Sequence, residues 1–191
     1  ELGDAASFAH CDVTSEDDIA AAVDLAVSEF GRLDIMFNNA GIVGVVGRIA
    51  EMPADAWDHT MSILLRGVFL GTKHAARVMQ AQGSGVIINT SSVYGQMAAE
   101  LSFTYNVSKA AVDMMTKCAA LELGPHNIRV CAVAPGRVDT PLLRKYEELG
   151  LWEHIRREQM RDTFTQPGEI ANVVAFLASD EANCINGCTV N

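Results

Sequence analysis

The sequence predicts a single α/β domain over residues 1–191, built on a doubly wound and mostly parallel sheet. Apolar runs of strand length alternate along the chain with segments whose apolar residues recur at helical spacing. The expected strands are almost continuously apolar, which is typical of strands covered by helices on both faces. A chain of 191 residues, 49% of them hydrophobic, is also long enough to bury such a core.

The first expected elements are a short strand, a helix and a second strand. Residues 5–10 form a short apolar run, which we interpret as a strand. Residues 14–18 supply hydroxyl side chains for an N-cap and acids for a first turn, so they predict a helix that Gly31 closes. Residues 33–37 form the next strand, and the turn that ends it is residues 38–41, Asn-Asn-Ala-Gly.

The rest of the chain continues this alternation. The expected helices are residues 55–82, 103–123, 141–161 and 167–179. The expected strands are residues 85–90, residues 128–133 and the start of a strand at residues 188–191. Pro167 suits the first position of the last helix, because the N–H that proline lacks would be unpaired there.

Composition excludes several classes of function. A formal net charge of −10 argues against nucleic-acid binding, which calls for clustered Lys and Arg. The five cysteines show no CxxC pair and no zinc-ligand spacing, and the five histidines are scattered, so we expect no metal site and no metal-dependent hydrolase. No apolar run approaches the roughly 20 residues that cross a bilayer. An odd number of cysteines in apolar surroundings fits a reducing compartment, and we expect a cytoplasmic protein.

Tyr105 and Lys109 form the most informative pair. One helical turn separates them, so they lie on one face of the expected helix. A phenol normally ionises near pH 10, and a nearby ammonium favours the phenolate, so the pair could act as an acid/base nearer neutrality. A tyrosine and a lysine also share a helix face by coincidence in many proteins.

Ser92 follows the expected strand 85–90, at the edge of the sheet where open α/β folds bind ligands. Its hydroxyl could hold a substrate carbonyl oxygen while Tyr105 supplies the proton. An ordinary turn after a strand also favours serine. Two further motifs, residues 38–41 and residues 135–141, end other expected strands. Each alone could be a plain turn, but all of them stand at carboxyl ends of expected parallel strands.

The order of these motifs resembles the short-chain dehydrogenase/reductase family, and the resemblance covers essentially all 191 residues. The matching motifs are Asp12-Val13, NNAG at residues 38–41, Ser-Ser-Val at residues 91–93, YxxxK at residues 105–109 and PGxVxTP at residues 135–141. The resemblance implies a Rossmann-like fold and an NAD(P)-dependent oxidoreductase. Such an enzyme interconverts a secondary alcohol and a ketone by hydride transfer, with NAD slightly favoured here over NADP.

The resemblance also implies a role for each matching residue. Tyr105 would be the catalytic acid/base, Lys109 would lower its pKa and bind the nicotinamide ribose, and Ser92 would position the reacting carbonyl or alcohol. The residues that would hold the cofactor are Asp12 and Val13 at the adenine ring, Asn39, Ala40 and Gly41 along the adenosine, Tyr105 and Lys109 at the nicotinamide ribose, and Pro135, Gly136, Val138 and Thr140 at the nicotinamide. Val138 would bind the carboxamide through its backbone, and Asn38 would hold the end of its strand.

The sequence departs from the family at three places. The TGxxxGxG unit, whose backbone N–H groups bind the pyrophosphate, is absent, and so is the strand end that selects NAD or NADP. The family usually has an Asn three residues before a Gly in its fourth helix, where it holds a water of the proton relay, and Leu64 occupies that place before Gly67. We therefore interpret the chain as an internal fragment, incomplete at both ends. It would contain strands 3, 4, 5, 6 and the start of strand 7 of the family's 3-2-1-4-5-6-7 sheet.

Two interpretations of function remain open. Residues 140–165 would cover the substrate, and their apolar character suggests a hydrophobic or ring-bearing one, although the same side chains could pack on the sheet or a neighbouring subunit. These apolar residues are Leu142, Leu143, Tyr146, Leu149, Leu151, Trp152 and Ile155. The alternative is a non-catalytic dehydrogenase-like fragment or paralogue that acts through its interaction surfaces. Leu64 and the absent phosphate loop favour this alternative, and the intact Ser92, Tyr105 and Lys109 weigh against it.

On the family's pattern we expect a homodimer or homotetramer formed by the helices at residues 66–82 and 103–123. The apolar residues that could form this interface are Val112, Met114, Met115, Ala119 and Leu123. The same side chains could instead pack entirely on the sheet, so the expected oligomer rests on the resemblance.

The isolated 191-residue chain should be poorly stable and should lack affinity for a dinucleotide. Strands 1 and 2 of the family's order belong between strands 3 and 4, so their absence would leave unpaired backbone groups along two strand edges. Titration of the chain with NAD(H), followed by protein fluorescence and calorimetry, should show no binding. Micromolar binding, or a cooperative thermal melt that shifts upward with NAD, would contradict this expectation.

Overall fold

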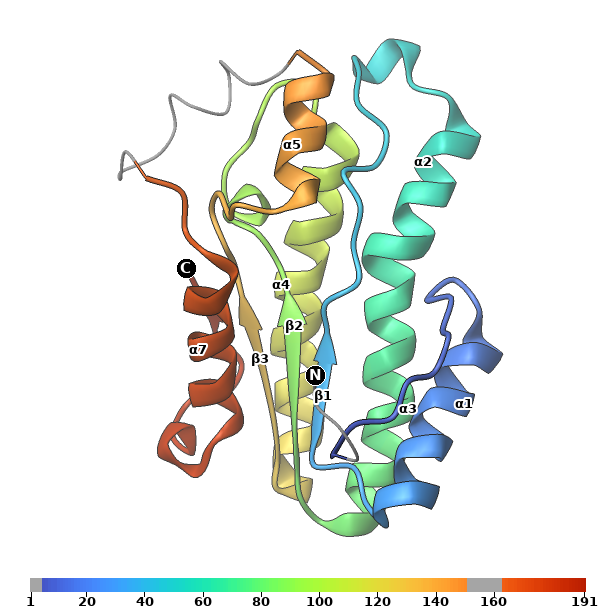
Figure 1. Cartoon of the computed structure of the whole chain (residues 1–191), viewed down its shortest axis with the longest axis vertical. Coiled ribbons are helices and arrows are strands. Elements are labelled where there is room, and N and C mark those ends of the chain that lie inside the picture. The colour runs from blue at the N-terminus through green and yellow to red at the C-terminus, as the bar shows by residue number, and fades with distance from the viewer. Residues whose placement is uncertain (1–4, 151–162) are drawn as a thin grey trace.

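The computed structural model describes residues 5–150 and 163–191, and a parallel sheet lies at its centre. In the described part of the chain the strand order is β1 (Ile35–Asn38), β2 (Gly85–Thr90), β3 (Ile128–Val133) and β4 (Thr189–Val190). The register places Asn38 beside Asn89 and Thr90 beside Val133. Because all the pairs are parallel, the carboxyl ends of the strands lie at one edge of the sheet (Figure 1).

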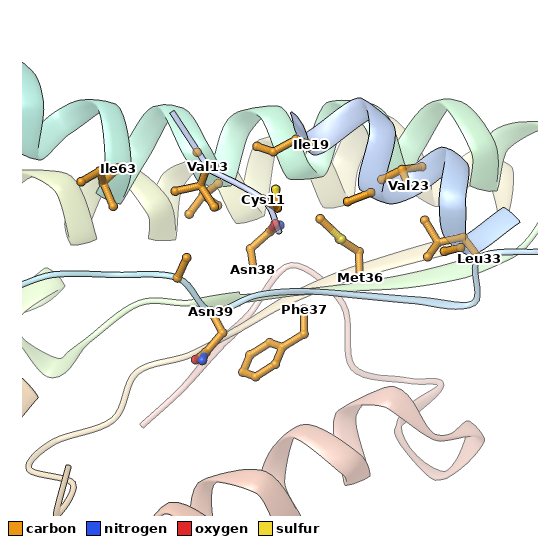
Figure 2. A pocket seen from close by; sticks show the side chains of 15 residues that line it. Cys11, Val13, Ile19, Val23, Leu33, Met36, Phe37, Asn38, Asn39 and Ile63 are labelled. Atoms are coloured by element: carbon orange, nitrogen blue, oxygen red, sulfur yellow. The ribbon is translucent and has the colours of Figure 1, made fainter. Parts of the chain in front are cut away.

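Helices cover both faces of the sheet, as the sequence predicts. The described helices are α1 (Glu16–Phe30), α2 (Ala54–Met61), α3 (Gly67–Gln82), α4 (Phe103–Leu123), α5 (Pro141–Glu148) and α7 (Pro167–Ala178). On one face α3 packs on α1 and β1, and α4 packs on β3, while α7 packs on β2 and β3. Figure 2, which looks along the sheet, shows α1 (blue) on one side and α7 (pale red) on the other. The predicted α/β fold with a doubly wound parallel sheet is confirmed.

Alternate residues of the central strands enter two separate cores. Ile87 and Val130 pack in a cluster with Met79 of α3 and Leu123 of α4. The neighbouring residues, Ile88 and Cys131, enter a second cluster with Leu177 of α7. Since successive side chains of a strand point to opposite faces, a strand buried on both faces is apolar at every position.

Short-range capping groups set the helix ends. The Ser15 side chain accepts a hydrogen bond from the Asp18 N–H and starts α1, as predicted. Gly31 ends α1 in the left-handed conformation, with φ of 80°. Gly83, with φ of 71°, ends α3 in the same way.

The helix predicted over residues 55–82 is interrupted. α2 ends at Met61 and α3 begins at Gly67, and between them lies a π-helical turn, η3 (Ser62–Arg66). Such single wide turns insert an extra residue into a helix and often occur near functional sites. Leu64 lies in this turn and is fully buried. The apolar spacing continues through the turn, so the sequence pattern did not reveal it.

The strand predicted at residues 5–10 is wrong. These residues pair with no strand in the described part of the chain, and they are exposed, Phe8 by 91%. A strand forms only where a neighbour satisfies its N–H and C=O groups, which an apolar run alone does not provide. Within the described residues, β1 is the first strand of the sheet, and Ile35 and Phe37 on it are partly exposed.

The C-terminal part agrees with the predicted elements as far as it is described. The helix expected from residue 141 begins as α5 with Thr140 as its N-cap, and α5 ends at Glu148. Leu151, Trp152 and Ile155 of the expected apolar lobe lie outside the described residues. In the part of the chain that the structure describes, no helix has the length and apolar character needed to span a membrane.

Gly71 should be essential for the close packing of α3 on β1. A Cβ at this position would lie 2.0 Å from Asn38 Oδ1 and 2.8 Å from Met36 Cε. In the full-length protein, Gly71→Ala should therefore lower the free energy of unfolding by about 1–3 kcal/mol, measured in urea. The control is Gly168→Ala, where a Cβ would meet nothing within 4 Å. Equal stability of the two variants would show that α3 can move away without cost.

Candidate active site

The amino-terminal half of α4 brings Tyr105 and Lys109 to the carboxyl end of β2. Lys109 is 3% exposed, and its Nζ donates a hydrogen bond to the carbonyl oxygen of Thr90, 2.7 Å away. The same Nζ lies 5.5 Å from the centroid of the Tyr105 ring. The ammonium therefore joins the helix to the last residue of the strand and places a positive charge beside the phenol ring.

Ser92 faces this pair from the loop that follows β2. It caps the short 3-10 turn η4 (Val93–Gly95), and its Oγ accepts a hydrogen bond from the Tyr94 N–H at 3.2 Å. Its hydroxyl donates to the carbonyl oxygen of Pro135 at 3.5 Å, and Ser92 is close enough to the Tyr105 phenol to act on its pKa. The structure thus brings together the three residues that the sequence singled out, while their catalytic roles stay a prediction.

The loop that carries Ser92 is tied to two other elements. The side-chain amide of Asn106 on α4 donates to the carbonyl oxygens of Tyr94, at 2.9 Å, and Met97, at 2.6 Å. Gln96 and Asn191 exchange two side-chain hydrogen bonds of 2.8 Å each. Sequence reasoning missed these anchors. Asn106 gave one signal, a polar residue within the YxxxK motif, whereas Gln96 and Asn191 gave none.

Burial dominates the electrostatics of the site. Desolvation raises the pKa of Tyr105 above its usual value, and the hydrogen bond from Ser92 acts in the opposite direction. Desolvation lowers the pKa of Lys109 to about 8, and the charge of Asp113 opposes this change. The sequence argument expected Lys109 to lower the pKa of Tyr105. In the structure the pKa of Tyr105 is raised rather than lowered, because the phenol is withdrawn from water.

The residues expected along the adenosine lie at a different part of the sheet edge. Val13, Asn39 and Ala40 line a cavity of about 280 Å³ between α1, β1 and α3. Figure 2 shows Met36 and Asn38 pointing toward the helices, while Phe37 and Asn39 point to the opposite face. The structure therefore brings Val13 to the same cavity as Asn39 and Ala40.

Asn39 and Asp12, two of the residues expected to hold the adenosine part of the cofactor, also make local hydrogen bonds. The Asn39 side-chain oxygen accepts a hydrogen bond from Thr90 Oγ1 at 3.1 Å, which links the ends of β1 and β2. The carboxylate of Asp12 accepts from the N–H and hydroxyl of Thr14, at 2.9 and 2.8 Å, and the N–H is the main cause that lowers the pKa of Asp12. Asp12 thus closes the turn that leads into α1.

The segment after β3 is tied to Thr165 by a short parallel bridge. Val138 forms an isolated parallel bridge with Thr165, through the carbonyl of Arg137 and the N–H of Asp139. These bonds use the groups on either side of Val138, so its own N–H and C=O are turned away from Thr165. A Cβ at Gly136 would meet nothing within 4 Å, so the backbone there borders open space.

Comparison with known proteins gives one consistent family. The family model described as "Enoyl-(Acyl carrier protein) reductase" matches residues 1–191. The chain is 43% identical to momilactone A synthase of Oryza sativa subsp. japonica, over 98% of this chain and 71% of that protein. It is 44% identical to (+)-borneol dehydrogenase 2 of Salvia officinalis, over 95% of this chain and 68% of that protein.

A solved structure agrees. The 3-ketoacyl-(acyl-carrier-protein) reductase from Brucella melitensis, complexed with NADH, superposes with a TM-score of 0.91 at 32% identity and covers 99% of this chain and 77% of its own. The chain belongs to the short-chain dehydrogenase/reductase family. This confirms the resemblance inferred from the motifs, and the protein is accordingly an enzyme, an oxidoreductase.

Leu64 gives this dehydrogenase an apolar contact at the turn after β1. A Cβ at Gly41 would lie 3.5 Å from Leu64 Cδ2, so the leucine packs directly against the Asn-Asn-Ala-Gly turn. A hydrocarbon side chain offers no hydrogen bond to water or to the backbone of that turn. In the folded protein Leu64 therefore cannot make the hydrogen bond to water that the family's usual Asn makes at this position.

The described residues fit one end of a nicotinamide dinucleotide. The Lys109 ammonium has three N–H donors, of which the Thr90 carbonyl takes one, so two remain for ribose hydroxyls, and a Cβ at Gly136 would meet nothing within 4 Å. For the pyrophosphate, the described residues offer no glycine-rich turn between a strand and a helix N-terminus. Among these residues there is also no group of three or more His, Cys, Asp or Glu placed to hold a metal ion.

Gly95 should set the distance between the Ser92 loop and α4. A Cβ at Gly95 would lie 2.9 Å from both the carbonyl carbon and the carbonyl oxygen of Lys109. Gly95→Ala should push Ser92 away from Tyr105 and lower the turnover rate of the full-length enzyme by about 10²-fold, because such misplacements of about 1 Å are costly. Gly168→Ala, which has free space, should keep the parent rate. An unchanged rate in Gly95→Ala would show that the loop does not depend on this contact.

Proposed function

We propose that the protein interconverts a secondary alcohol and a ketone with NAD or NADP, using Ser92, Tyr105 and Lys109. The observation that carries this proposal is their convergence at the carboxyl end of β2. Ser92 is close enough to the Tyr105 phenol to lower its pKa, and Lys109 Nζ lies 5.5 Å from the centroid of the same ring. A hydroxyl donor and a phenol on one substrate oxygen is the arrangement that carbonyl reduction requires.

Tyr105 moves the proton in this proposal. During ketone reduction its phenol donates a proton to the carbonyl oxygen, and during alcohol oxidation its phenolate accepts the hydroxyl proton. Because burial raises its pKa, Tyr105 is protonated at neutral pH, which suits the reductive direction. When bound, the nicotinamide would supply the hydride to the carbonyl carbon of the ketone, or accept it from the same carbon of the alcohol.

Ser92 and Lys109 hold charge and geometry. The Ser92 hydroxyl, fixed by the Tyr94 N–H, donates to the substrate oxygen as negative charge develops on it. Lys109, fixed by the Thr90 carbonyl, keeps a positive charge near the phenolate and has N–H groups left for ribose hydroxyls. Asp12, Val13, Asn39, Ala40, Gly41, Pro135, Gly136, Val138 and Thr140 would complete the cofactor site, and NAD is the first cofactor to test.

The substrate proposed is hydrophobic and ring-bearing. Val43 is buried in a small cluster with Val46 from the same loop, Leu101 from the loop before α4, and Leu143 from α5. Figure 1 shows α5 beyond the arrowheads of the strands, past the edge of the sheet where their carboxyl ends lie. An apolar molecule would suit segments that gather apolar side chains in this way, and the similar Salvia protein is named for borneol, a cyclic alcohol.

We also propose that copies of the chain associate through α3 and α4. Phe69 of α3 and Met114 and Leu121 of α4 are exposed large apolar side chains, Leu121 by 82%. Exposed apolar surface of this kind on neighbouring helices favours a protein interface. Val112 and Leu123, which the sequence argument also assigned to this interface, are buried and face the core.

Tyr105→Phe should abolish most of the oxidoreductase activity. With NAD and a cyclic secondary alcohol, NADH formation followed by absorbance should fall by about 10²–10⁴-fold in kcat, because proton transfer by a positioned group contributes that much. The matched control is Tyr94→Phe, since Tyr94 contacts Ser92 through its backbone N–H and the Tyr105 ring through its own ring, at 6.5 Å. A primary alcohol without a ring should be a poorer substrate.

The rates of alcohol oxidation and ketone reduction by the unmutated protein should depend differently on pH, because the pKa of Tyr105 is raised. Alcohol oxidation needs the phenolate and should rise as the pH is raised, whereas ketone reduction needs the phenol and should not rise. If the parent protein carries no activity with any alcohol while still binding NAD(H), the non-catalytic alternative would replace the proposed function.

A further inference from the structure

Asp113 places a second buried charge close to Lys109. It lies one helical turn beyond Lys109 on α4, and residues at this spacing are neighbours on one face of a helix. Asp113 is 9% exposed and Lys109 is 3% exposed. A carboxylate this deeply buried is costly to keep unless it is hydrogen-bonded or paired with a positive charge.

Groups from two other elements fix the Asp113 carboxylate. Thr189 of β4 donates a hydrogen bond from its hydroxyl to Oδ1, at 2.9 Å. The backbone of Gly95 lies against the other oxygen, since a Cβ at Gly95 would be 3.0 Å from Oδ2. Asp113 therefore stands where α4, β4 and the loop that carries Ser92 meet, and its position depends on all three.

The charges around Lys109 are few. The groups that face its ammonium include the phenol of Tyr105 on the same helix and the uncharged carbonyl of Thr90 on β2. Toward Asp113, β4 presents the uncharged Thr189 and η4 presents the backbone of Gly95. Among the described residues, Asp113 is the charge that acts on the pKa of Lys109, and it raises that pKa against the effect of burial.

We propose that Asp113 is a positioning residue of this active site, whose buried carboxylate, held by Thr189 one helical turn beyond Lys109, keeps the ammonium beside Thr90 and Tyr105 charged. This inference rests on the proposed function, because it matters for catalysis only if Tyr105 works as the acid/base. Asp113 touches neither substrate nor cofactor and acts through Lys109. Through its hydrogen bond with Thr189, Asp113 also makes the charge of the site depend on β4, the C-terminal strand, which pairs with β3.

Asp113→Asn tests the charge with little change in shape. The amide oxygen can still accept from Thr189, so the variant removes the negative charge and keeps the hydrogen bond. The matched control is Thr189→Val, which removes the hydrogen bond and keeps the charge. Asp113→Glu restores the charge and serves as the conservative rescue.

The first measurement is the pKa of Lys109 in the full-length protein without substrate or cofactor, by NMR of lysine labelled at Cε. Asp113→Asn should lower this pKa by about 1 pH unit or more, because it removes the nearby negative charge that raises the pKa of Lys109. Thr189→Val should lower it by less, and Asp113→Glu should return it toward the parent value. An unchanged pKa in Asp113→Asn, or an equal change in Asp113→Asn and Thr189→Val, would overturn the proposal.

The second measurement is the pH dependence of kcat. In Asp113→Asn the Lys109 ammonium should lose its proton at a lower pH than in the parent. The fall of kcat for ketone reduction at alkaline pH should therefore move to lower pH in Asp113→Asn, and much less in Thr189→Val. A lowered Lys109 pKa with no movement of the pH profile would also overturn the positioning role. Absence of activity in the parent protein would instead refute the proposed function, and the NMR titration would still decide whether Asp113 controls the charge of Lys109.

Discussion

The site depends on one buried contact, the hydrogen bond from the Lys109 ammonium to the carbonyl oxygen of Thr90. An ammonium withdrawn from water is unfavourable, and this contact returns part of the lost solvation. It also fixes α4 against the end of β2, so that Tyr105 lies above the same strand end. A second bond works in parallel, since the Ser91 hydroxyl donates to the backbone carbonyl of Lys109 at 3.2 Å. Loss of either would weaken the attachment of the helix to the strand that leads to Ser92.

A buried chain of polar side chains gives this contact its rigidity. The Asn38 amide donates to Asn89 Oδ1 at 2.9 Å, and the Asn89 amide donates to Thr116 Oγ1 at 3.0 Å. These bonds run from β1 through β2 to α4, one residue before Asn39 and Thr90 on their strands. Because an unpaired amide in the core is costly, the arrangement is specific: each group fits only with its neighbours in register. Gly71 makes this network possible, because the absence of a side chain there leaves room for the Asn38 amide.

The site combines reactivity with electrostatic cost. Burial raises the pKa of Tyr105 and lowers the pKa of Lys109, so both groups are held toward their neutral forms. Asp113 and the Ser92 hydroxyl act in the opposite direction on Lys109 and Tyr105 respectively. With a pKa of about 8, Lys109 has charged and neutral forms that are both populated near neutral pH, whereas Tyr105 stays protonated and is ready to donate its proton.

The sequence by itself determined what local interactions determine. Ser15, Gly31 and Gly83 set helix ends through groups a few residues away, and the YxxxK spacing placed Tyr105 and Lys109 on one helix face. The tertiary structure decided the rest. Residues 5–10 are apolar but pair with no strand in the described part, and the π-helical turn at Ser62–Arg66 interrupts a continuous apolar pattern. Gln96 is hydrogen-bonded to Asn191, and Asp113 to Thr189, although the partners of each pair lie far apart in the sequence. Contacts between distant residues leave no periodic trace in the sequence, and the burial that shifts the pKa of Tyr105 exists only once those contacts exclude water.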